Sequence, residues 1–206
     1  MENIFDQYAN EYDLWFVENE ELYKAELDAV GSLMDKDKTY IEVGVGTGLF
    51  ASKLGITEGI DPSDEMSNIA KKRGIKVQNA LAENLPYNTK GLDGIIMITV
   101  DCFVKDIMPV FNEAYRVLKD NGSYVMAFLN RESPLGAEYE ASKKTNVYYR
   151  DATFRSFNEM KDLLSKAGLK IVNVKQTVYK LENTKQPVKD GYGEGVFTVI
   201  KAVKEI

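Results

Sequence analysis

The sequence predicts an α/β protein built on a doubly wound, mostly parallel sheet with an antiparallel last strand. Short apolar segments alternate with amphipathic segments along most of the 206 residues, as strands and helices do in such folds. The last two expected strands have only residues 181–195 between them. A connection without a helix favours a hairpin, and therefore an antiparallel strand at the edge of the sheet.

Each element is expected from local patterns. Residues 3–30 read as helical, because apolar and aromatic residues recur at mixed helical spacing. Strands are expected at residues 39–43, 56–60, 75–78, 92–99, 123–129, 169–178 and 196–203. Helices are expected at residues 47–54, 63–73, 106–119 and 156–168. Asn121-Gly122 is expected to end the third of these helices, and Ser156 and Glu159 have capping-box spacing at the start of the fourth.

Composition excludes several classes of function. The chain has no histidine and a single cysteine, Cys102, so histidine-dependent triads, zinc sites of Cys and His, and an intrachain disulfide are impossible. No metal site is expected. The net charge of −6 argues against bulk nucleic-acid binding. No apolar run approaches the ~20 residues that span a bilayer, and the first residues lack a secretory pattern, so we expect a cytoplasmic protein without a membrane partner.

A glycine loop, E-V-G-V-G-T-G at residues 42–48, joins an expected buried strand to a helix. Gly44 and Gly46 permit a tight turn and close approach of a ligand to the backbone, and the loop lies where α/β sheets bind ligands. A dinucleotide fingerprint would place glycine at position 49, where this chain has leucine. Glu42 would repel a pyrophosphate but accept hydrogen bonds from an ammonium group, such as that of S-adenosylmethionine (SAM). A structural turn without a ligand is the alternative.

Asp61 ends the second expected strand, 17 residues after Gly44. A carboxylate at this place can accept hydrogen bonds from both ribose hydroxyls of an adenosine. Alternatively, Asp61 caps the helix that begins at Pro62, and the two roles can coexist with one oxygen each.

These motifs resemble the class I SAM-dependent methyltransferases, in particular the branch related to ubiquinone and menaquinone methyltransferases (methyltransferase type 11-like). The resemblance covers nearly the whole chain and implies one Rossmann-like domain over residues 1–206, with SAM as cofactor and S-adenosylhomocysteine as product. The cofactor-binding residues that the loop and the resemblance indicate are Glu42, Gly44, Gly46, Gly48, Asp61, Pro62, Met66, Leu81, Ala82, Thr99 and Val100. Many relatives have Asp where this chain has Leu81, which leaves backbone contacts for the adenine.

The acceptor side is less defined, because Asp101-Cys102-Phe103 stands where many relatives carry a histidine-rich segment. We expect a helical flap at about residues 1–35 and a substrate lid at about residues 131–155, since connections this long are often functional. Core packing of the flap and a plain surface loop are the alternatives. The alternative for Asp101 is a solvated loop or cap residue, and the alternative for Arg131 is a solvated loop position. The candidate substrate residues are Tyr12, Asp101, Arg131, Tyr139, Tyr148 and Tyr149.

The sequence therefore predicts a SAM-dependent methyltransferase with a small-molecule acceptor. A non-catalytic SAM-binding protein and a nicotinamide-dependent oxidoreductase are the alternatives. A catalytic base is not identified, and neither the acceptor nor the oligomeric state is defined by the sequence.

Overall fold

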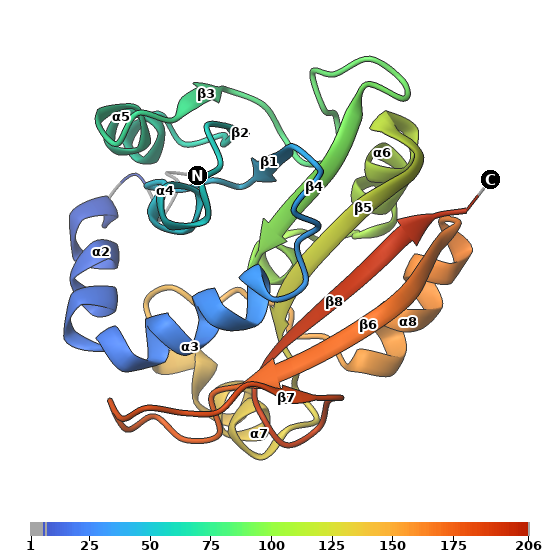
Figure 1. Ribbon diagram of the computed structural model, residues 1–206. Coiled ribbons are helices and arrows are strands. Elements are labelled where there is room, and N and C mark those ends of the chain that lie inside the picture. The colour runs from blue at the N-terminus through green and yellow to red at the C-terminus, as the bar shows by residue number, and fades with distance from the viewer. Residues whose placement is uncertain (1–5, 7, 206) are drawn as a thin grey trace.

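The computed structural model describes residue 6 and residues 8–205, and it contains one twisted sheet with helices on both faces (Figure 1). The eight strands lie in the order β3-β2-β1-β4-β5-β8-β6-β7. Their bounds are β1 Tyr40–Val43, β2 Glu58–Ile60, β3 Lys76–Gln78, β4 Leu92–Ile98, β5 Leu118–Leu129, β6 Leu169–Thr177, β7 Lys189–Asp190 and β8 Phe197–Lys204. The first five strands in chain order are parallel to one another. This arrangement confirms the predicted fold class.

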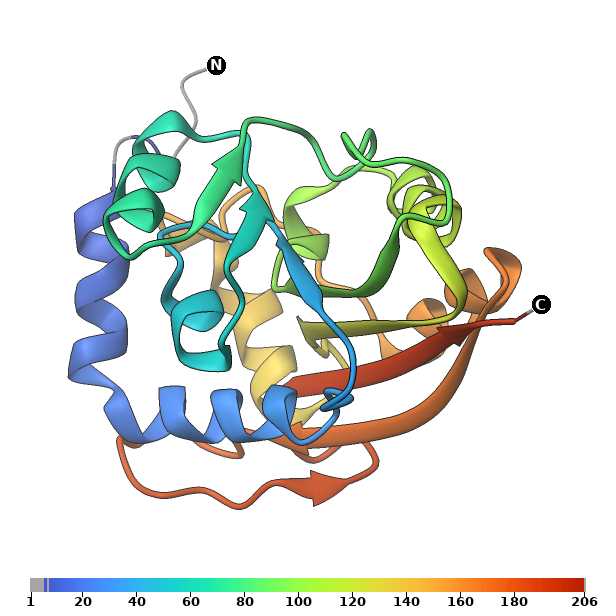
Figure 2. The same cartoon turned by 45° about the horizontal axis from the view of Figure 1, so that its top comes forward.

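Helices cover the two faces of this sheet. α3 packs against β5, β6 and β8 on one face, while α6 and α8 lie together on the other (Figures 1 and 2). The helices are α2 Ala9–Glu18, α3 Glu20–Gly31, α4 Leu49–Leu54, α5 Asp64–Lys72, α6 Met108–Val117, α7 Pro134–Ser142 and α8 Phe157–Lys166, with short 3₁₀ turns η1 Asp101–Phe103 and η2 Lys143–Thr145.

Strand β4 shows how the sequence produces two cores. Ile96 and Ile98 belong to the cluster beneath α3, whereas Ile95 and Met97 belong to the cluster beneath α6 and α8. Successive side chains of a strand point to opposite faces, so an apolar run is buried on both sides only in the interior of a covered sheet. The apolar run that predicted this strand therefore also positions it at the centre.

The antiparallel strand was predicted at the sheet edge, and this placement is wrong. β8 pairs antiparallel with both β5 and β6, and the short β7 forms the edge beyond β6. Burial explains the order. β8 is buried along nearly all its length, while β6 exposes residues such as Lys170 and Val172. The strand with the more apolar faces occupies the interior position.

Two helix boundaries also differ from expectation. The helical region predicted at residues 3–30 divides at Asn19 into α2 and α3, and its first residues, 3–5, lie outside the described part. Helix α6 ends at Val117, before Asn121-Gly122, and β5 starts at the next residue. The Asn-Gly pair instead lies where the pairing of β4 with β5 shifts register. By contrast, the capping box of Ser156 and Glu159 at α8 is confirmed.

The long connection at residues 131–155 is more structured than a loop. It contains α7 and η2, and Ser133 caps α7 by accepting a hydrogen bond from the Gly136 N–H. Within the part of the chain that the structure describes, no helix is both long and apolar enough to cross a membrane.

Candidate functional site

The glycine loop between β1 and α4 takes a backbone path that requires glycine. Gly44, Gly46 and Gly48 all have positive φ, at 72°, 52° and 79°. A Cβ on Gly44 would collide with Cγ2 of Val100, so the loop approaches the segment after β4 closely. A Cβ on Gly46 would meet no atom of the described residues within 4 Å, which leaves that backbone open to a ligand. Gly48 instead serves packing, because a Cβ there would press against Ala70 of α5.

Asp61 follows β2 and contacts the glycine loop through its carboxylate. One carboxylate oxygen accepts a hydrogen bond from the Gly46 N–H at 2.8 Å, and the other accepts one from the Ser63 N–H at 2.8 Å. Burial raises the pKa of Asp61, while these two hydrogen bonds oppose the rise. Asp61 is not the cap of α5, which was its alternative role, because Ser63 occupies the cap position and its hydroxyl accepts a hydrogen bond from the Met66 N–H.

Glu42 lies at the end of β1 with only 2% of its surface exposed. Burial raises its pKa well above the usual value, repulsion from Asp61 adds to the rise, and a hydrogen bond from the Ala51 backbone opposes it. Its Oε2 atom has no partner among the described residues. A cavity of about 30 Å³ beside Glu42 is also lined by Gly44, Gly46 and Tyr12. An unpartnered buried carboxylate oxygen next to such a space suits a hydrogen-bond donor from a ligand.

A larger cavity of about 400 Å³ opens above the carboxyl ends of β1, β2 and β4. The strand order reverses between β1 and β4, which is where open α/β sheets bind ligands. One part of the wall comes from Gly44, Gly46, Asp61, Pro62, Met66, Thr99 and Val100. The other part is aromatic and includes Tyr12, Trp15, Phe16, Phe103, Tyr139, Tyr148 and Tyr149. The structure therefore brings together predicted residues from the N-terminal helix, the sheet and the 131–155 connection.

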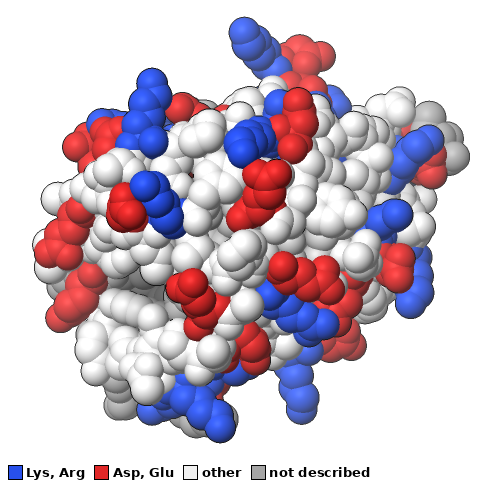
Figure 3. Space-filling view, turned by 90° about the horizontal axis from the view of Figure 1, so that it is seen from below, with Lys and Arg blue, Asp and Glu red and all other residues white. Residues whose placement is uncertain are grey.

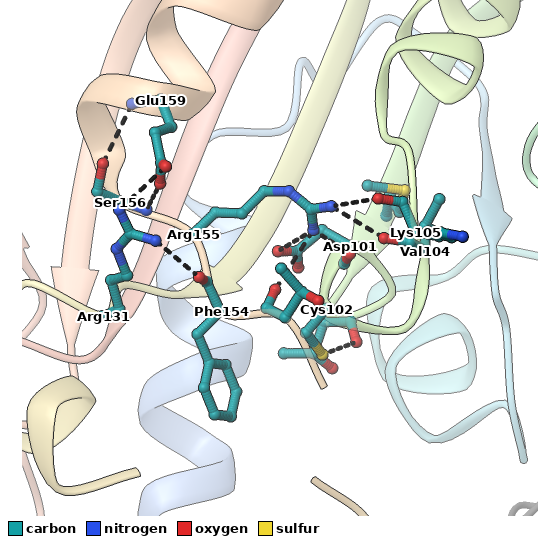
Figure 4. A network of polar contacts seen from close by, with 12 residues as sticks. Asp101, Cys102, Val104, Lys105, Arg131, Phe154, Arg155, Ser156 and Glu159 are labelled. Carbon is teal, nitrogen blue, oxygen red and sulfur yellow. Dashed lines mark hydrogen bonds and ion pairs between the residues drawn. The ribbon is translucent and has the colours of Figure 1, made fainter. Parts of the chain in front are cut away.

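Asp101, a candidate substrate residue, does not line this cavity, and the alternative of a solvated loop position is wrong. It is 1% exposed, and its carboxylate lies 3.9 Å from the guanidinium of Arg155, a residue that the sequence analysis missed (Figure 4). Arg155 also donates hydrogen bonds to the backbone carbonyl oxygens of Asp101 and, at 2.9 Å, of Val104. Burial raises the pKa of Asp101 to about 7, although Arg155 opposes the rise. This pair fastens η1 to the end of the 131–155 connection.

Glu42 and Gly48, described above, do not line the large cavity, and neither do Arg131, Leu81 and Ala82. Arg131 donates a hydrogen bond to Glu159 at 3.0 Å on the protein surface (Figure 4). Leu81 is 55% exposed, and Ala82 is buried in the core beneath α6 and α8. Direct contact of these three side chains with a ligand in the cavity has no support from their positions.

The sequence analysis also missed how α2 is fastened to the glycine loop. Asp13 accepts a hydrogen bond from the Thr47 hydroxyl at 2.6 Å and forms an ion pair with Arg73 at 2.5 Å. Arg73 donates a further hydrogen bond to the Thr47 carbonyl oxygen. The contacts join residues 34 and 60 positions apart, so no local pattern indicates them. They hold α2, with Tyr12 and Trp15, beside the cavity.

Comparison with known proteins now identifies the class to which this fold and site belong. The methyltransferase-domain family matches residues 41–126, which include the glycine loop, Asp61 and Thr99. A crystal structure from Thermotoga maritima, described as a SAM-dependent methyltransferase and "possible histamine N-methyltransferase", superimposes with a TM-score of 0.94 and 42% identity, covering all of both chains.

Two further relatives extend over nearly the whole chain. An uncharacterized protein of Methanocaldococcus jannaschii is 42% identical over 98% of this chain and 99% of its own. An uncharacterized protein of Mycobacterium tuberculosis is 31% identical over 96% of this chain and 72% of its own. The chain belongs to the SAM-dependent methyltransferases, and it is an enzyme whose cofactor is SAM. The unpartnered oxygen of Glu42 and the open backbone at Gly46 fit this cofactor.

Proposed function

We propose that this methyltransferase transfers the methyl group of SAM to a small-molecule acceptor held in the aromatic part of the cavity. The observation that carries the proposal is that one cavity is lined both by the predicted cofactor-binding residues and by aromatic side chains. The glycine loop, Asp61 and Thr99 adjoin a cluster of aromatic side chains within a single space of about 400 Å³. A space of this size accommodates small ligands, and its aromatic lining suits a compact, partly apolar acceptor.

In this proposal each cofactor-binding residue contacts a different part of SAM. Glu42 accepts hydrogen bonds from the amino group of the methionine part, and Asp61 receives the ribose hydroxyls with the lone pairs that Gly46 and Ser63 leave available. Pro62 and Met66 pack beside the adenosine, and they line the same wall. Thr99 is a non-glycine residue with a φ of 52°, a conformation that often marks a functional position.

SAM supplies an activated methyl group on a sulfonium, so the protein contributes positioning and exclusion of water. We propose that α2 is the flap and the 131–155 connection the lid of this site. Tyr148 links them, because its ring contacts the rings of Tyr8 and Tyr12 edge-on, at centroid distances of 6.2 and 6.1 Å. Both segments thus reach the cavity from outside the sheet.

Charge on the surface also favours a small acceptor over a nucleic acid. On the face over α3, α7 and β7, acidic and basic side chains are interspersed, and no continuous basic surface is visible (Figure 3). The net charge of the chain is −6. Nucleic-acid enzymes gain affinity from contiguous Lys and Arg.

The test is a transfer assay with SAM labelled in its methyl group. The labelled donor is offered with separated small-molecule, protein and RNA fractions, and with single compounds that include histamine, the compound in the name of the Thermotoga relative. We expect label in the small-molecule fraction. Tyr149→Ala should reduce transfer about tenfold or more and change SAM affinity little, because it removes an aromatic wall. Val147→Ala, an exposed neighbour, is the control. Label confined to protein or RNA would overturn the proposal.

A further inference from the structure

Glu26 is a charged residue in the buried stripe of α3. It lies one turn from Leu22 and from Val30, both fully buried, and it is itself only 8% exposed. Its side chain lines the large cavity. Among the residues that the structure describes, none provides the Glu26 carboxylate with a hydrogen bond or an ion pair. A buried carboxylate without a partner costs free energy, so its presence at a cavity wall calls for an explanation.

The described residues on which the charge of Glu26 acts are aromatic. Its charge acts on Tyr12 of α2, Tyr139 of α7 and Tyr149 of the 131–155 connection, and raises the pKa of each beyond the effect of burial, that of Tyr139 to about 12. The rings of Tyr139 and Tyr149 meet edge-on at 5.6 Å. Among the described residues that line the cavity, none is a Lys or an Arg. Aromatic faces and a carboxylate are the groups with which proteins bind ammonium ions.

Glu26 lines the large cavity and not the small one, whereas Glu42 lines the small one and not the large one. Asp61 raises the pKa of Glu42 by repulsion, whereas Glu26 contributes to neither of those two shifts. Glu26 and Glu42 both raise the pKa of Tyr12, but of these two carboxylates only Glu26 raises the pKa values of Tyr139 and Tyr149. Tyr12 lines both the large cavity and the small one beside Glu42, and so lies between the two regions.

We propose that Glu26 binds the amino group of the methyl acceptor and accepts its proton, so that the acceptor is a small amine. This inference rests on the proposed function, because it assigns a chemical class to the acceptor in the same cavity. An ammonium ion supplies the charge partner that Glu26 lacks, and the tyrosine rings supply cation–π contacts.

The group transfer balances with Glu26 as the proton acceptor. The acceptor nitrogen passes one proton to the carboxylate and exposes its lone pair. That lone pair forms the new N–C bond as the C–S bond breaks, and the electron pair of the C–S bond remains on sulfur. The methylated nitrogen leaves as an ammonium, and Glu26 then releases its proton to water. Burial raises the pKa of Glu26 to about 8, which suits a proton acceptor at neutral pH.

The charge of Glu26 also predicts how binding depends on pH. The titratable groups that face it are Tyr12, Tyr23, Tyr139 and Tyr149, and their raised pKa values keep them neutral below pH 8. An ammonium ion binds the ionised carboxylate, so amine affinity should increase as the pH rises from 6 towards 8. The increase should reach at most about tenfold per pH unit, with release of up to about one proton per site.

The experiment is calorimetry with the protein saturated in S-adenosylhomocysteine. The probes are ethylamine, butylamine and 2-phenylethylamine, each paired with the alcohol of the same carbon skeleton. We expect the wild type to bind at least one amine about tenfold or more tightly than its alcohol. Glu26→Gln should lose this preference and its pH dependence, with nearly unchanged affinity for S-adenosylhomocysteine. Glu20→Gln, an exposed residue of the same helix, should behave as wild type.

Each other outcome has a defined meaning. If no amine binds the wild type better than its alcohol, or if Glu26→Gln keeps the preference, the inference is wrong. If Glu26→Gln loses S-adenosylhomocysteine as strongly as the amine, Glu26 serves the cofactor and the inference is also wrong. Neither result affects the small-molecule proposal, which fails separately if labelled methyl groups appear only in protein or RNA.

Discussion

Replacing Glu26 by Gln should stabilise the protein at pH 8 and have much less effect at pH 5. Burial raises the pKa of this carboxyl from 4.5 to about 8. Between these values the unfolded chain has released a proton that the folded protein retains, so the stability of the wild type falls as the pH rises. The loss starts near pH 4.5 and is complete above pH 8. Glutamine does not titrate, and therefore removes this loss.

The magnitude follows from the same shift. Each pKa unit corresponds to about 1.4 kcal/mol, so a rise from 4.5 to about 8 sets an upper bound of about 5 kcal/mol. Water that enters the adjoining cavity solvates part of the charge and lowers the cost. The difference in the free energy of unfolding between Glu26→Gln and the wild type should therefore increase by about 2 kcal/mol from pH 5 to pH 8.

Urea unfolding at both pH values measures this difference in the protein without ligands. The only tryptophan, Trp15, provides a fluorescence signal, and circular dichroism provides a second. Asp101, with a pKa of about 7, also titrates in this range, but it is common to both proteins and cancels in the comparison. Glu20→Gln serves as control. A stability difference that is the same at pH 5 and pH 8 would refute the reasoning about a buried, unpaired Glu26.

Three further substitutions test other parts of the site. Gly46→Ala places a methyl group in the open space beside the loop at a positive φ, and should weaken SAM binding about tenfold with a stability loss of about 1 kcal/mol; calorimetry showing unchanged affinity would contradict this. Arg155→Met leaves buried Asp101 without its partner and should lower the free energy of unfolding by about 3 kcal/mol, measured in urea; a loss below about 0.5 kcal/mol would refute the account of this pair. Asp13→Asn removes the ion pair with Arg73 and should speed SAM dissociation about threefold in stopped-flow measurements; an unchanged rate would show that this ion pair does not hold α2 over the cavity.

The sequence predicted those features that depend only on residues close to one another along the chain. The capping box at Ser156 and Glu159 and the turn at Gly44 follow from local geometry, and both have the expected form. The apolar run at residues 92–99 predicted the strand β4, and a strand that is buried on both faces has no polar side.

Contacts between distant residues were not predictable in this way. The burial of Asp101 was not predicted, because its partner Arg155 lies 54 residues further along the chain. Glu26 was not singled out, although one local signal exists: it occupies a position that helical spacing assigns to the buried stripe of α3, together with Leu22 and Val30. A charged residue in the apolar stripe of a helix indicates a binding site only when the other residues that line the same cavity are known.

The cofactor site is the central claim, and titration of SAM into the purified protein by calorimetry tests it most directly. The account predicts micromolar binding by the wild type, about −8 kcal/mol. Asp61→Ala should weaken it at least about tenfold, because it removes the ribose partner and the hydrogen bond to Gly46. Asp64→Ala, three residues further along the chain and exposed, should bind as the wild type does. Equal affinity of wild type and Asp61→Ala, with both proteins folded by circular dichroism, would contradict the placement of SAM at this loop.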